Sequence, residues 1–288
     1  MYKKEMYRNM QRFNQQYEDI HTFLAENADN GVNEHFHWGR FRWHMGHSML
    51  ETEKLTSIAI FRNETGKVCG LVTYDTDYDD RNYILHNGDK ELVAMMIQHV
   101  ISAEGNKAQF MVNERDLVLS EMLLEYGFQL LKQDNCVLQM NLNGNLSYKL
   151  PDGFELLSAG HAIDMMKYQM VIFKGFNNEG IVEFEPWADE VMKPQPHDNN
   201  SLRVLVADGM EYCAHCGIWY ESGETAYIEP VVTIPRCRSK GLGKVVVYEA
   251  LSRVRDMGAK RAVVVSDQPF YHSIGFNLSS EYNVWGRL

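Results

Sequence analysis

A short basic turn carries the residue types best suited to holding an anion. The turn spans residues 235–243 and contains Gly241 and Gly243, which lack a Cβ and let the backbone approach a ligand closely. Helical spacing begins directly after the turn, so the unpaired N–H groups and the dipole of a helix N-terminus favour negative charge there. Three basic side chains add to this potential: Arg238, Lys240 and Lys244. The sequence therefore predicts a pyrophosphate-binding turn.

Two common phosphate-binding patterns do not fit this turn. A P-loop needs a glycine further upstream and Ser or Thr directly after its lysine, where this chain has Val245. A dinucleotide-binding fingerprint needs a small residue where the chain has Val246. Both patterns are therefore excluded.

The elements around the turn must position it. Residues 227–234 are rich in β-formers, and residues 244–257 place four apolar side chains on one helical face before Gly258, a residue suited to ending a helix. These apolar side chains are Val247, Ala250, Leu251 and Val254. The sequence predicts a strand, a tight turn and a helix in direct succession.

The turn and a later motif together resemble a known family. Pro235, Arg238, Gly241 and Gly243 match the R-x-x-G-x-G/A pattern of the GNAT N-acetyltransferases, in which a strand ends near a proline. Residues 270–276 (FYHSIGF) resemble the Y-x-x-x-G-F motif of that family, and strand-like residues 262–265 lie between the two. The match is specific over residues 200–276 and rests on architecture elsewhere. The loop 266–269 is shorter than usual and lacks the family's common asparagine, which leaves cofactor contacts there open.

The resemblance implies acetyl-CoA as co-substrate and no metal. It places the cofactor along a strand edge and the turn, on Val231, Val232, Thr233, Arg238, Ser239, Lys240, Gly241, Leu242, Gly243 and Lys244. Tyr271 matches the family tyrosine near the thioester sulfur and is expected to act as general acid, with packing beside the cofactor as the alternative.

The general base is a separate question. Strand alternation predicts that Glu229, Val231 and Thr233 share one face, which makes Glu229 the first candidate for the base. A structural ion pair or simple exposure is the alternative for Glu229, and His215 and Tyr220 are weaker candidates.

Composition sets limits on the class of protein. The chain has 288 residues, 45% hydrophobic and 23% charged, which suits two globular domains. Its net charge is −11 and both halves are acidic, which argues against nucleic acid or an anionic membrane as partner. No apolar run reaches the ~18 residues of a membrane helix, and the start lacks a signal-peptide core. Five cysteines are an odd, sparse set, so a reduced, cytoplasmic protein is expected.

Two dipeptides recur in order at nearly one offset. Cys69-Gly70 returns as Cys216-Gly217, and Gly127-Phe128 returns as Gly275-Phe276. We therefore expect two α/β (α+β) GNAT-like domains in tandem, each with a mixed, mostly antiparallel sheet flanked by helices. The expected boundaries are residues 1–143, a linker 144–152, and residues 153–288.

The two copies differ in their chemical groups. The first has only Asn87-Gly88-Asp89 at the expected turn, and Leu123 falls where Tyr271 stands in the second. The first copy is therefore expected to be degenerate and the second catalytic.

Three further patterns leave alternatives open. His35, His37, His44 and His47 predict a packed aromatic surface in preference to a metal site, because no carboxylate or thiolate has matching spacing. Cys213 and Cys216 have redox or zinc spacing, but alternate strand positions point them to opposite faces. The acidic segment 177–199 is either a solvated stretch or a lid that attracts an amine.

The sequence thus predicts an acetyl-CoA-dependent N-acetyltransferase in which a primary amine attacks the thioester directly. A small-molecule or peptide amine is expected as acceptor, and the oligomeric state cannot be read. The alternative is a non-catalytic acyl-CoA-binding or regulatory protein, because a fold survives the loss of its chemistry.

Overall fold

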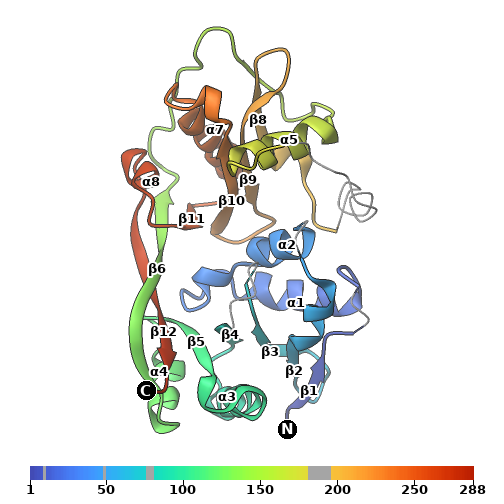
Figure 1. The fold of residues 1–288 in the computed structure, drawn as a ribbon, viewed down its shortest axis with the longest axis vertical. Coiled ribbons are helices and arrows are strands. Elements are labelled where there is room, and N and C mark those ends of the chain that lie inside the picture. Colours follow the sequence, from blue (N-terminus) through green and yellow to red (C-terminus); the bar gives the residue numbers. More distant parts are fainter. Residues whose placement is uncertain (9–10, 48–49, 76–80, 181–195) are drawn as a thin grey trace. The chain divides into compact units, whose positions relative to one another are not determined.

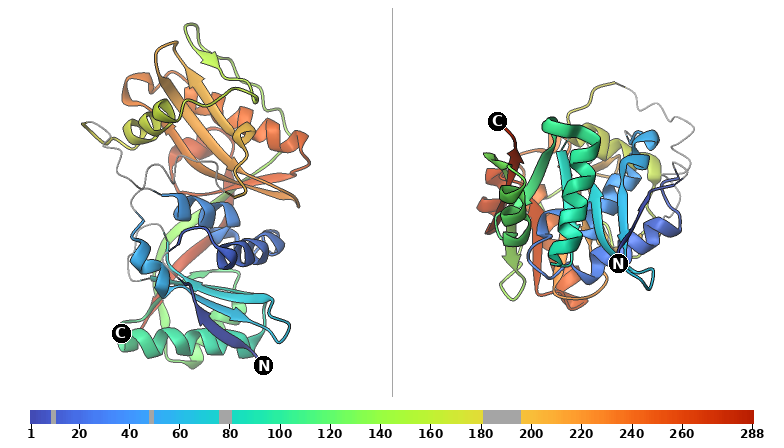
Figure 2. Two further views of the ribbon diagram at one scale, coloured as in Figure 1. Left: turned by 90° about the vertical axis from the view of Figure 1, so that its right-hand side faces the viewer. Right: turned by 90° about the horizontal axis from the view of Figure 1, so that it is seen from below.

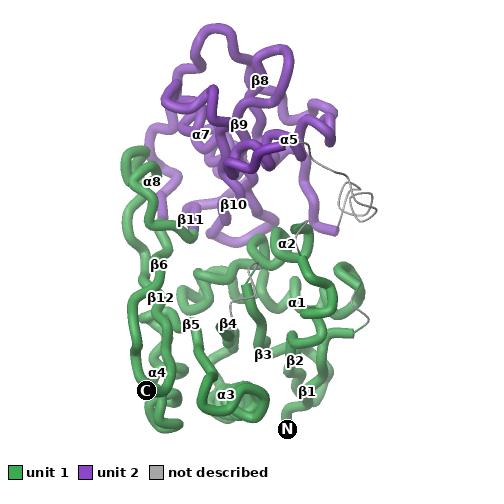
Figure 3. The backbone as a smooth tube through the Cα atoms, in the orientation of Figure 1, with its two compact units in different colours: residues 1–138, 265–288 green, residues 139–264 purple. Residues whose placement is uncertain are grey.

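A computed structural model describes residues 1–288 except 9–10, 48–49, 76–80 and 181–195 (Figure 1). The chain forms two compact units (Figure 3). Unit 1 combines Met1–Leu138 with Val265–Leu288, and unit 2 is Gln139–Val264.

Unit 1 is built on a mixed, mostly antiparallel sheet in the order β1-β2-β3-β4-β5-β12-β6. Its strands are β1 (Lys3–Met6), β2 (Ala59–Arg62), β3 (Val68–Thr73), β4 (Arg81–His86), β5 (Gln109–Asn113), β12 (Asn277–Gly286) and β6 (Gln129–Asn141), the last of which continues into unit 2. Only β4 and β5 pair in parallel among the recorded pairs of described strands in this unit.

Helices lie on both faces of this sheet (Figure 1). They are α1 (Gln15–Glu26), α2 (Trp38–Gly46), α3 (Lys90–Glu104) and α4 (Leu117–Glu125), with 3-10 turns η1 (Glu34–Phe36), η2 (Thr52–Ser57) and η3 (Gly105–Lys107). The short helix α8 (Pro269–Ser273) precedes β12 in the chain. Helix α3 begins after Asp89, whose carboxylate accepts from the backbone N–H groups of Glu91 and Leu92. Its apolar face packs with α4 and the sheet into a core that includes Leu92, Met96 and Phe110.

Strand β12 occupies an unexpected place in unit 1. It lies between β5 and β6 and pairs with β5 in antiparallel register from Tyr282 opposite Asn113 to Trp285 opposite Phe110. The compact units therefore do not follow the boundaries expected from the sequence copies, 1–143 and 153–288. The assignment of those two copies stays a prediction.

In unit 2 the strands follow one another in the order β6-β11-β10-β9-β8-β7. The strands are β7 (Glu155–Leu156), β8 (Arg203–Ala207), β9 (Tyr212–Trp219), β10 (Thr225–Thr233) and β11 (Arg261–Val265). Helices α5 (Met165–Gly175) and α7 (Leu242–Asp256) cover opposite faces of this sheet (Figure 2), and η4 (Asn200–Leu202) and η5 (Pro235–Cys237) are short turns.

The predicted fold class is confirmed. Both units have a central mixed sheet, mostly antiparallel, with flanking helices. No helix in the described part of the chain combines the length and hydropathy needed to cross a membrane.

Candidate active site

Strands β10 and β11 of unit 2 pair only at one end. Their parallel pairing runs from Thr225 opposite Arg261 to Tyr227 opposite Val263, whereas β10 continues to Thr233. The remaining residues of β10 pair with β9 on their other side. The edge of β10 that faces away from β9 therefore offers its backbone groups to a ligand over Val231, Val232 and Thr233, the strand residues expected from the sequence.

A β-bulge lies where the two strands part. The register between β10 and β9 shifts by one residue between Ile228 and Val231. The indole Nε1 of Trp219 donates to the carbonyl oxygen of Glu229 at 2.7 Å and fixes the bulge. Gly217 lies against the same carbonyl, and any Cβ at position 217 would overlap it. A bulge next to the site aims the following residues.

The close approach at Gly217 gives a testable prediction. Substitution Gly217→Ala is expected to lower the free energy of unfolding by about 1–3 kcal/mol, because backbone atoms cannot swing away as a side chain can. Thermal unfolding and calorimetric CoA titration would measure the effect. The matched control is Gly144→Ala, which has open space and should change neither result. A Gly217→Ala protein of unchanged stability and CoA affinity would contradict this account of the bulge.

The basic turn after β10 has the backbone shape expected of an anion site. Gly241 precedes the first residue of α7 with φ +83°, and Ser239 also has a positive φ of 60°. No side chain caps the start of α7, so the first N–H groups of this helix are left for a ligand or water. Lys240 and Lys244 are exposed at the same end of the helix.

Arg238 braces the turn. Its Nε donates to the carbonyl of Thr233 at 3.0 Å, and its Nη2 donates to the carbonyl of Gly175 at 2.9 Å. The side chain therefore ties the end of β10 to the end of α5. This contact favours a structural role for Arg238 within the predicted cofactor set.

A cavity of about 420 Å³ opens beside Gly241 and Lys244. Its other wall is the segment expected only as a linker, through Ser147, Tyr148 and Lys149. The hydroxyl of Tyr148 donates to Glu249 at 2.6 Å, which anchors the segment to α7. Burial, followed by Glu249, raises the pKa of Tyr148 to about 12, so this hydroxyl stays a donor. Lys149 is thus a cationic side chain at the site that sequence reasoning missed, because only the folded chain brings it to the helix.

Glu229 does not follow the predicted alternation. Because of the bulge, Val231 opposes Cys216 and Ile228 opposes Ile218. Cys216 and Ile218 are two residues apart in β9 and share a face of the sheet, so Val231 and Ile228 share that face as well. The carboxylate of Glu229 instead accepts from the hydroxyl of Tyr227 at 2.8 Å. Glu229 therefore lies beside Tyr227, and the prediction that it shares a face with Val231 and Thr233 is wrong.

This placement sets Glu229 toward the α5 face of the sheet. Tyr227 opposes Trp219, and Trp219 lies on the same face of β9 as His215 by strand alternation. His215 contacts Tyr168 of α5, so Tyr227 and the adjacent Glu229 carboxylate lie on the face that α5 covers. Glu229 is half-buried there. A partly shielded, oriented carboxylate is suited to accepting a proton from an amine that approaches on that face.

His215 is held by structure. It is buried, its Nδ1 donates to the carbonyl of Val204 at 3.0 Å, and its Nε2 faces the hydroxyl of Tyr168 at 3.3 Å. Burial lowers the pKa of His215 to about 3. Both ring nitrogens are engaged, so this side chain is unsuited to the role of base.

The cysteines of unit 2 are also buried and free. Burial raises the pKa of Cys216, and burial together with Cys237 raises the pKa of Cys213 to about 12. Raised thiol pKa values disfavour the thiolate needed for nucleophilic attack or zinc binding.

Tyr220, the other weaker candidate for the base, donates its hydroxyl to the carbonyl of Gly223 at 2.9 Å, a local turn contact.

Tyr271 belongs to α8 in unit 1. It is buried and packs edge-on against Phe270 and Phe276, with ring centroids 5.1 and 5.6 Å away. The motif residues 270–276 thus form a short helix and turn that fixes the tyrosine ring. Its role as acid stays a prediction.

The histidine-rich stretch of unit 1 is packed inside the unit. His35 stacks between Tyr83 and Tyr282 at 5.7 and 5.4 Å, and His44 lies edge-on to Tyr74 at 4.9 Å. Both histidines are buried, so the prediction of an aromatic surface becomes an aromatic interior. Within the described residues, His35, His37, His44 and His47 do not converge as metal ligands.

Residues 181–195, most of the acidic segment predicted as a solvated stretch or a lid, lie outside the described residues.

Comparisons with known proteins agree with this geometry. The model of the acetyltransferase (GNAT) family matches residues 170–276, which include β10, the basic turn and Tyr271. A search of curated proteins found no match.

Solved structures extend the similarity to nearly the whole chain. A GCN5-related N-acetyltransferase from Sphaerobacter thermophilus has a TM-score of 0.55 at 11% identity, covering 99% of this chain and 94% of its own. A tandem GNAT protein from the clavulanic acid biosynthesis pathway has a TM-score of 0.55 at 10% identity, covering 98% of both chains. The C-terminal domain of a putative lysylphosphatidylglycerol synthetase from Agrobacterium fabrum has a TM-score of 0.54 at 13% identity, covering 80% of this chain and 83% of its own.

At these identities the structures establish the fold and leave the substrate open. The family match covers the parted strand β10 and the basic turn. Residues 170–276 thus match the acetyltransferase (GNAT) family model, and the fold of the chain resembles those of solved GNAT proteins, a tandem one among them.

Proposed function

We propose that this protein transfers an acetyl group from acetyl-CoA to a primary amine by direct attack. The observation that carries the proposal is the free edge of β10, which leads straight into an uncapped helix start flanked by lysines. This arrangement matches the two ends of the cofactor, an amide-bearing arm and a pyrophosphate.

The cofactor is expected to lie along residues 231–244. Pantetheine is extended and carries amides, so it can hydrogen-bond the β10 edge at Val231, Val232 and Thr233 as an added strand would. A backbone N–H of this strand would polarise the thioester carbonyl. The pyrophosphate would accept from N–H groups of residues 239–244, with Lys240, Lys244 and Lys149 supplying charge.

The chemical step needs two proton transfers. The amine nitrogen attacks the thioester carbon, a C–N bond forms, the C–S bond breaks, and the thiolate leaves. Glu229 is proposed to take the proton of the amine directly or through water, with Tyr227 orienting the carboxylate. Tyr271 is proposed to protonate the thiolate, on the strength of its motif. The N-terminal copy is proposed to be non-catalytic, and a cytoplasmic location is expected.

An assay of thiol release separates catalysis from mere binding. The protein is mixed with acetyl-CoA and a panel of amines, including peptide N-termini, and free CoA is followed. Release that requires an amine and falls at least about tenfold in Tyr271→Phe would support the enzyme, because general acids contribute on this scale or more. Tight CoA binding without turnover on any amine would favour the non-catalytic acyl-CoA-binding alternative.

Charge reversal tests the cofactor site itself. The double substitution Lys240→Glu, Lys244→Glu is expected to weaken CoA binding by about tenfold or more, since two phosphate attractions become repulsions. Lys167→Glu on α5 is the matched control and should bind CoA as the parent does. Unchanged CoA affinity in the double variant would refute docking at this turn.

A further inference from the structure

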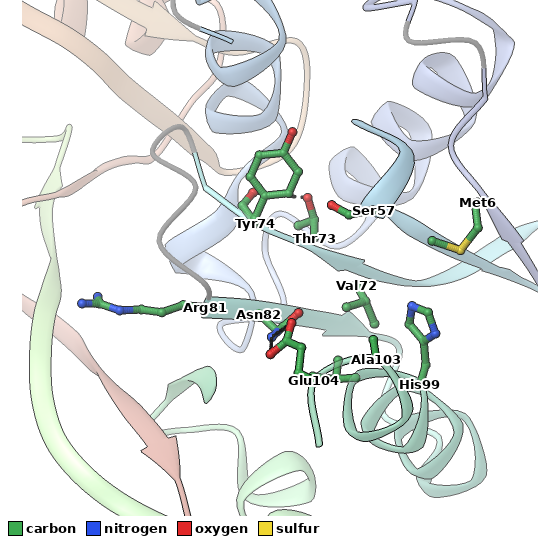
Figure 4. Close-up of a pocket in the computed structure, with 11 residues that line it drawn as sticks. Met6, Ser57, Val72, Thr73, Tyr74, Arg81, Asn82, His99, Ala103 and Glu104 are labelled. Atoms are coloured by element: carbon green, nitrogen blue, oxygen red, sulfur yellow. Dashed lines mark hydrogen bonds between the residues drawn. The ribbon is translucent and has the colours of Figure 1, made fainter. Parts of the chain in front are cut away.

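Unit 1 contains a cavity whose lining includes no residue of the motifs that carry the acetyltransferase resemblance. Its volume is about 280 Å³, and it lies between the start of β4, the end of β3 and the last turns of α3 (Figure 4). Asn82 and Glu104 meet at its polar side, and Val72, His99 and Ala103 surround it. None of these residues belongs to the predicted acetyl-CoA site.

Three hydrogen-bond donors along this wall are already used. The side-chain amide of Asn82 donates to both oxygens of Glu104 at 3.0 and 3.1 Å and to the carbonyl of Gln109 at 3.1 Å. The hydroxyl of Ser57 donates to the carbonyl of Lys54 at 2.7 Å. The hydroxyl of Thr73 donates to the carbonyl of Tyr74 at 3.2 Å. A ligand beside Glu104 therefore meets donors that are already engaged, and the hydroxyl of Tyr74, which also lines the cavity, is a further donor.

Arg81 does not change this balance. Its Nη1 binds Asp134 at 2.9 Å, and its side chain points away from Glu104 in Figure 4. The guanidinium charge is thus directed toward another carboxylate. Another cation, Lys4, lies at His99, where its Nζ is 3.1 Å from Nδ1 of the ring, so Arg81 and Lys4 are both engaged by side chains other than Glu104.

Acceptors and negative charge dominate the same wall. A carboxylate offers about four acceptor positions, and the amide of Asn82 adds a carbonyl oxygen. Glu104 is also the last residue of α3, where the helix dipole places partial negative charge. Burial, followed by the neighbouring Lys4, lowers the pKa of His99 from its ordinary value, which disfavours a positive charge on this ring. The polar side of the cavity favours a cation that donates hydrogen bonds.

The rest of the cavity is apolar. Val72 and Val100 are buried in its wall, and Met6 and Ala103 add aliphatic surface. The volume equals that of about nine water molecules in the liquid. A bare metal ion would leave the apolar wall in contact with water and would find a single carboxylate.

We propose that this cavity binds a small primary ammonium ion with a short hydrocarbon tail. The ammonium group donates to the Glu104 carboxylate and the Asn82 carbonyl oxygen, and the tail covers Val72 and Val100. The N-terminal copy, which lacks the acetyltransferase motifs, thereby keeps a ligand site of its own.

Binding is tested on the intact chain with three probes of similar shape. Phenethylammonium is titrated by calorimetry and by ligand-observed NMR, beside the uncharged phenethyl alcohol and the non-donating trimethyl form of the amine. The primary amine is expected to bind at about millimolar concentration or tighter and each analogue at least about tenfold more weakly. Equal binding of amine and alcohol, or no binding of the amine at about 10 mM, would overturn the proposal.

Variants place the signal in the cavity. Glu104→Gln removes the charge with little change in shape and should weaken amine binding about tenfold or more. Glu125→Gln is the matched control, because Glu125 also ends a helix of unit 1 and is exposed. Ala103→Leu fills the cavity from an exposed helix position and should abolish binding while the protein keeps its melting temperature. Amine binding that survives both Glu104→Gln and Ala103→Leu lies elsewhere and refutes the site.

Discussion

Lowering the pH from 7 toward 4 is expected to remove several kcal/mol from the free energy of unfolding. His35 and His44 are buried, and burial lowers the pKa of each to about 4, while His215 falls to about 3 for the same reason. In the unfolded chain each imidazole regains a pKa near 6.5. Between pH 6.5 and 4 the unfolded state therefore binds more protons, so stability falls as the pH falls.

The expected slope is large. Each buried histidine contributes about 1.4 kcal/mol per pH unit in this window, or about 4 kcal/mol per pH unit for all three. Domains are stable by only about 5–15 kcal/mol, so unfolding is expected near pH 4 to 5. Urea unfolding at pH 7.5, 6.0 and 5.0, followed by circular dichroism, measures the slope.

Single substitutions assign the effect to residues. His44→Phe keeps an aromatic ring beside Tyr74 and should reduce the slope by about a third of the three-histidine value. Exposed His161→Gln should leave the slope unchanged. A slope that is the same in His44→Phe as in the parent would contradict the assignment. Five charged or titratable groups act on His35 and His44 in unit 1: Arg12, Arg40, His47, Asp75 and Asp116.

Removing β12 is expected to have an equally large effect on unit 1. A chain that ends at Phe276 loses the strand that pairs with β5 from Tyr282 to Trp285. It also loses the hydroxyls of Ser279 and Ser280, which lie 3.0 and 3.2 Å from a carboxylate oxygen of buried Glu34. A buried carboxylate that loses partners costs several kcal/mol.

Hydrogen exchange is the direct measurement. Amides of β5 and η1 should exchange at least about a hundredfold faster in the shortened chain, as expected for a loss of about 3 kcal/mol. Adding a peptide of residues 277–288 should restore protection. A chain lacking only Leu288, which is fully exposed, is the control and should exchange as the parent does. Normal protection of β5 without β12 would show that the strand is dispensable.

Local signals in the sequence predicted the strand, turn and helix of the site well. The residues expected from 227 to 257 form β10, η5 and α7, because β-formers, glycine and helical spacing all act over a few neighbours. Gly241 adopts the left-handed conformation that its position requires.

Features that depend on distant partners could not be predicted. The bulge that turns Glu229 toward Tyr227 arises from the pairing of β10 with β9 and from the contact with Gly217. The local pattern of residues in β10 predicts neither of these contacts. Lys149 reaches the start of α7 only through the path of the segment around it. The composition of β12 marks it as a strand but does not specify which strand lies beside it.

The position of β12 in the sheet of unit 1 also affects how the chain folds during its synthesis. Residues 1–138 leave the ribosome long before residues 277–286 are synthesised, yet the sheet of unit 1 needs both. Until then the edge of β5 has no neighbour on that side, and such an edge is open to wrong pairing or to a chaperone. Folding of unit 1 must therefore wait until residues 277–286 have been synthesised, with the slow kinetics of contacts far apart in sequence.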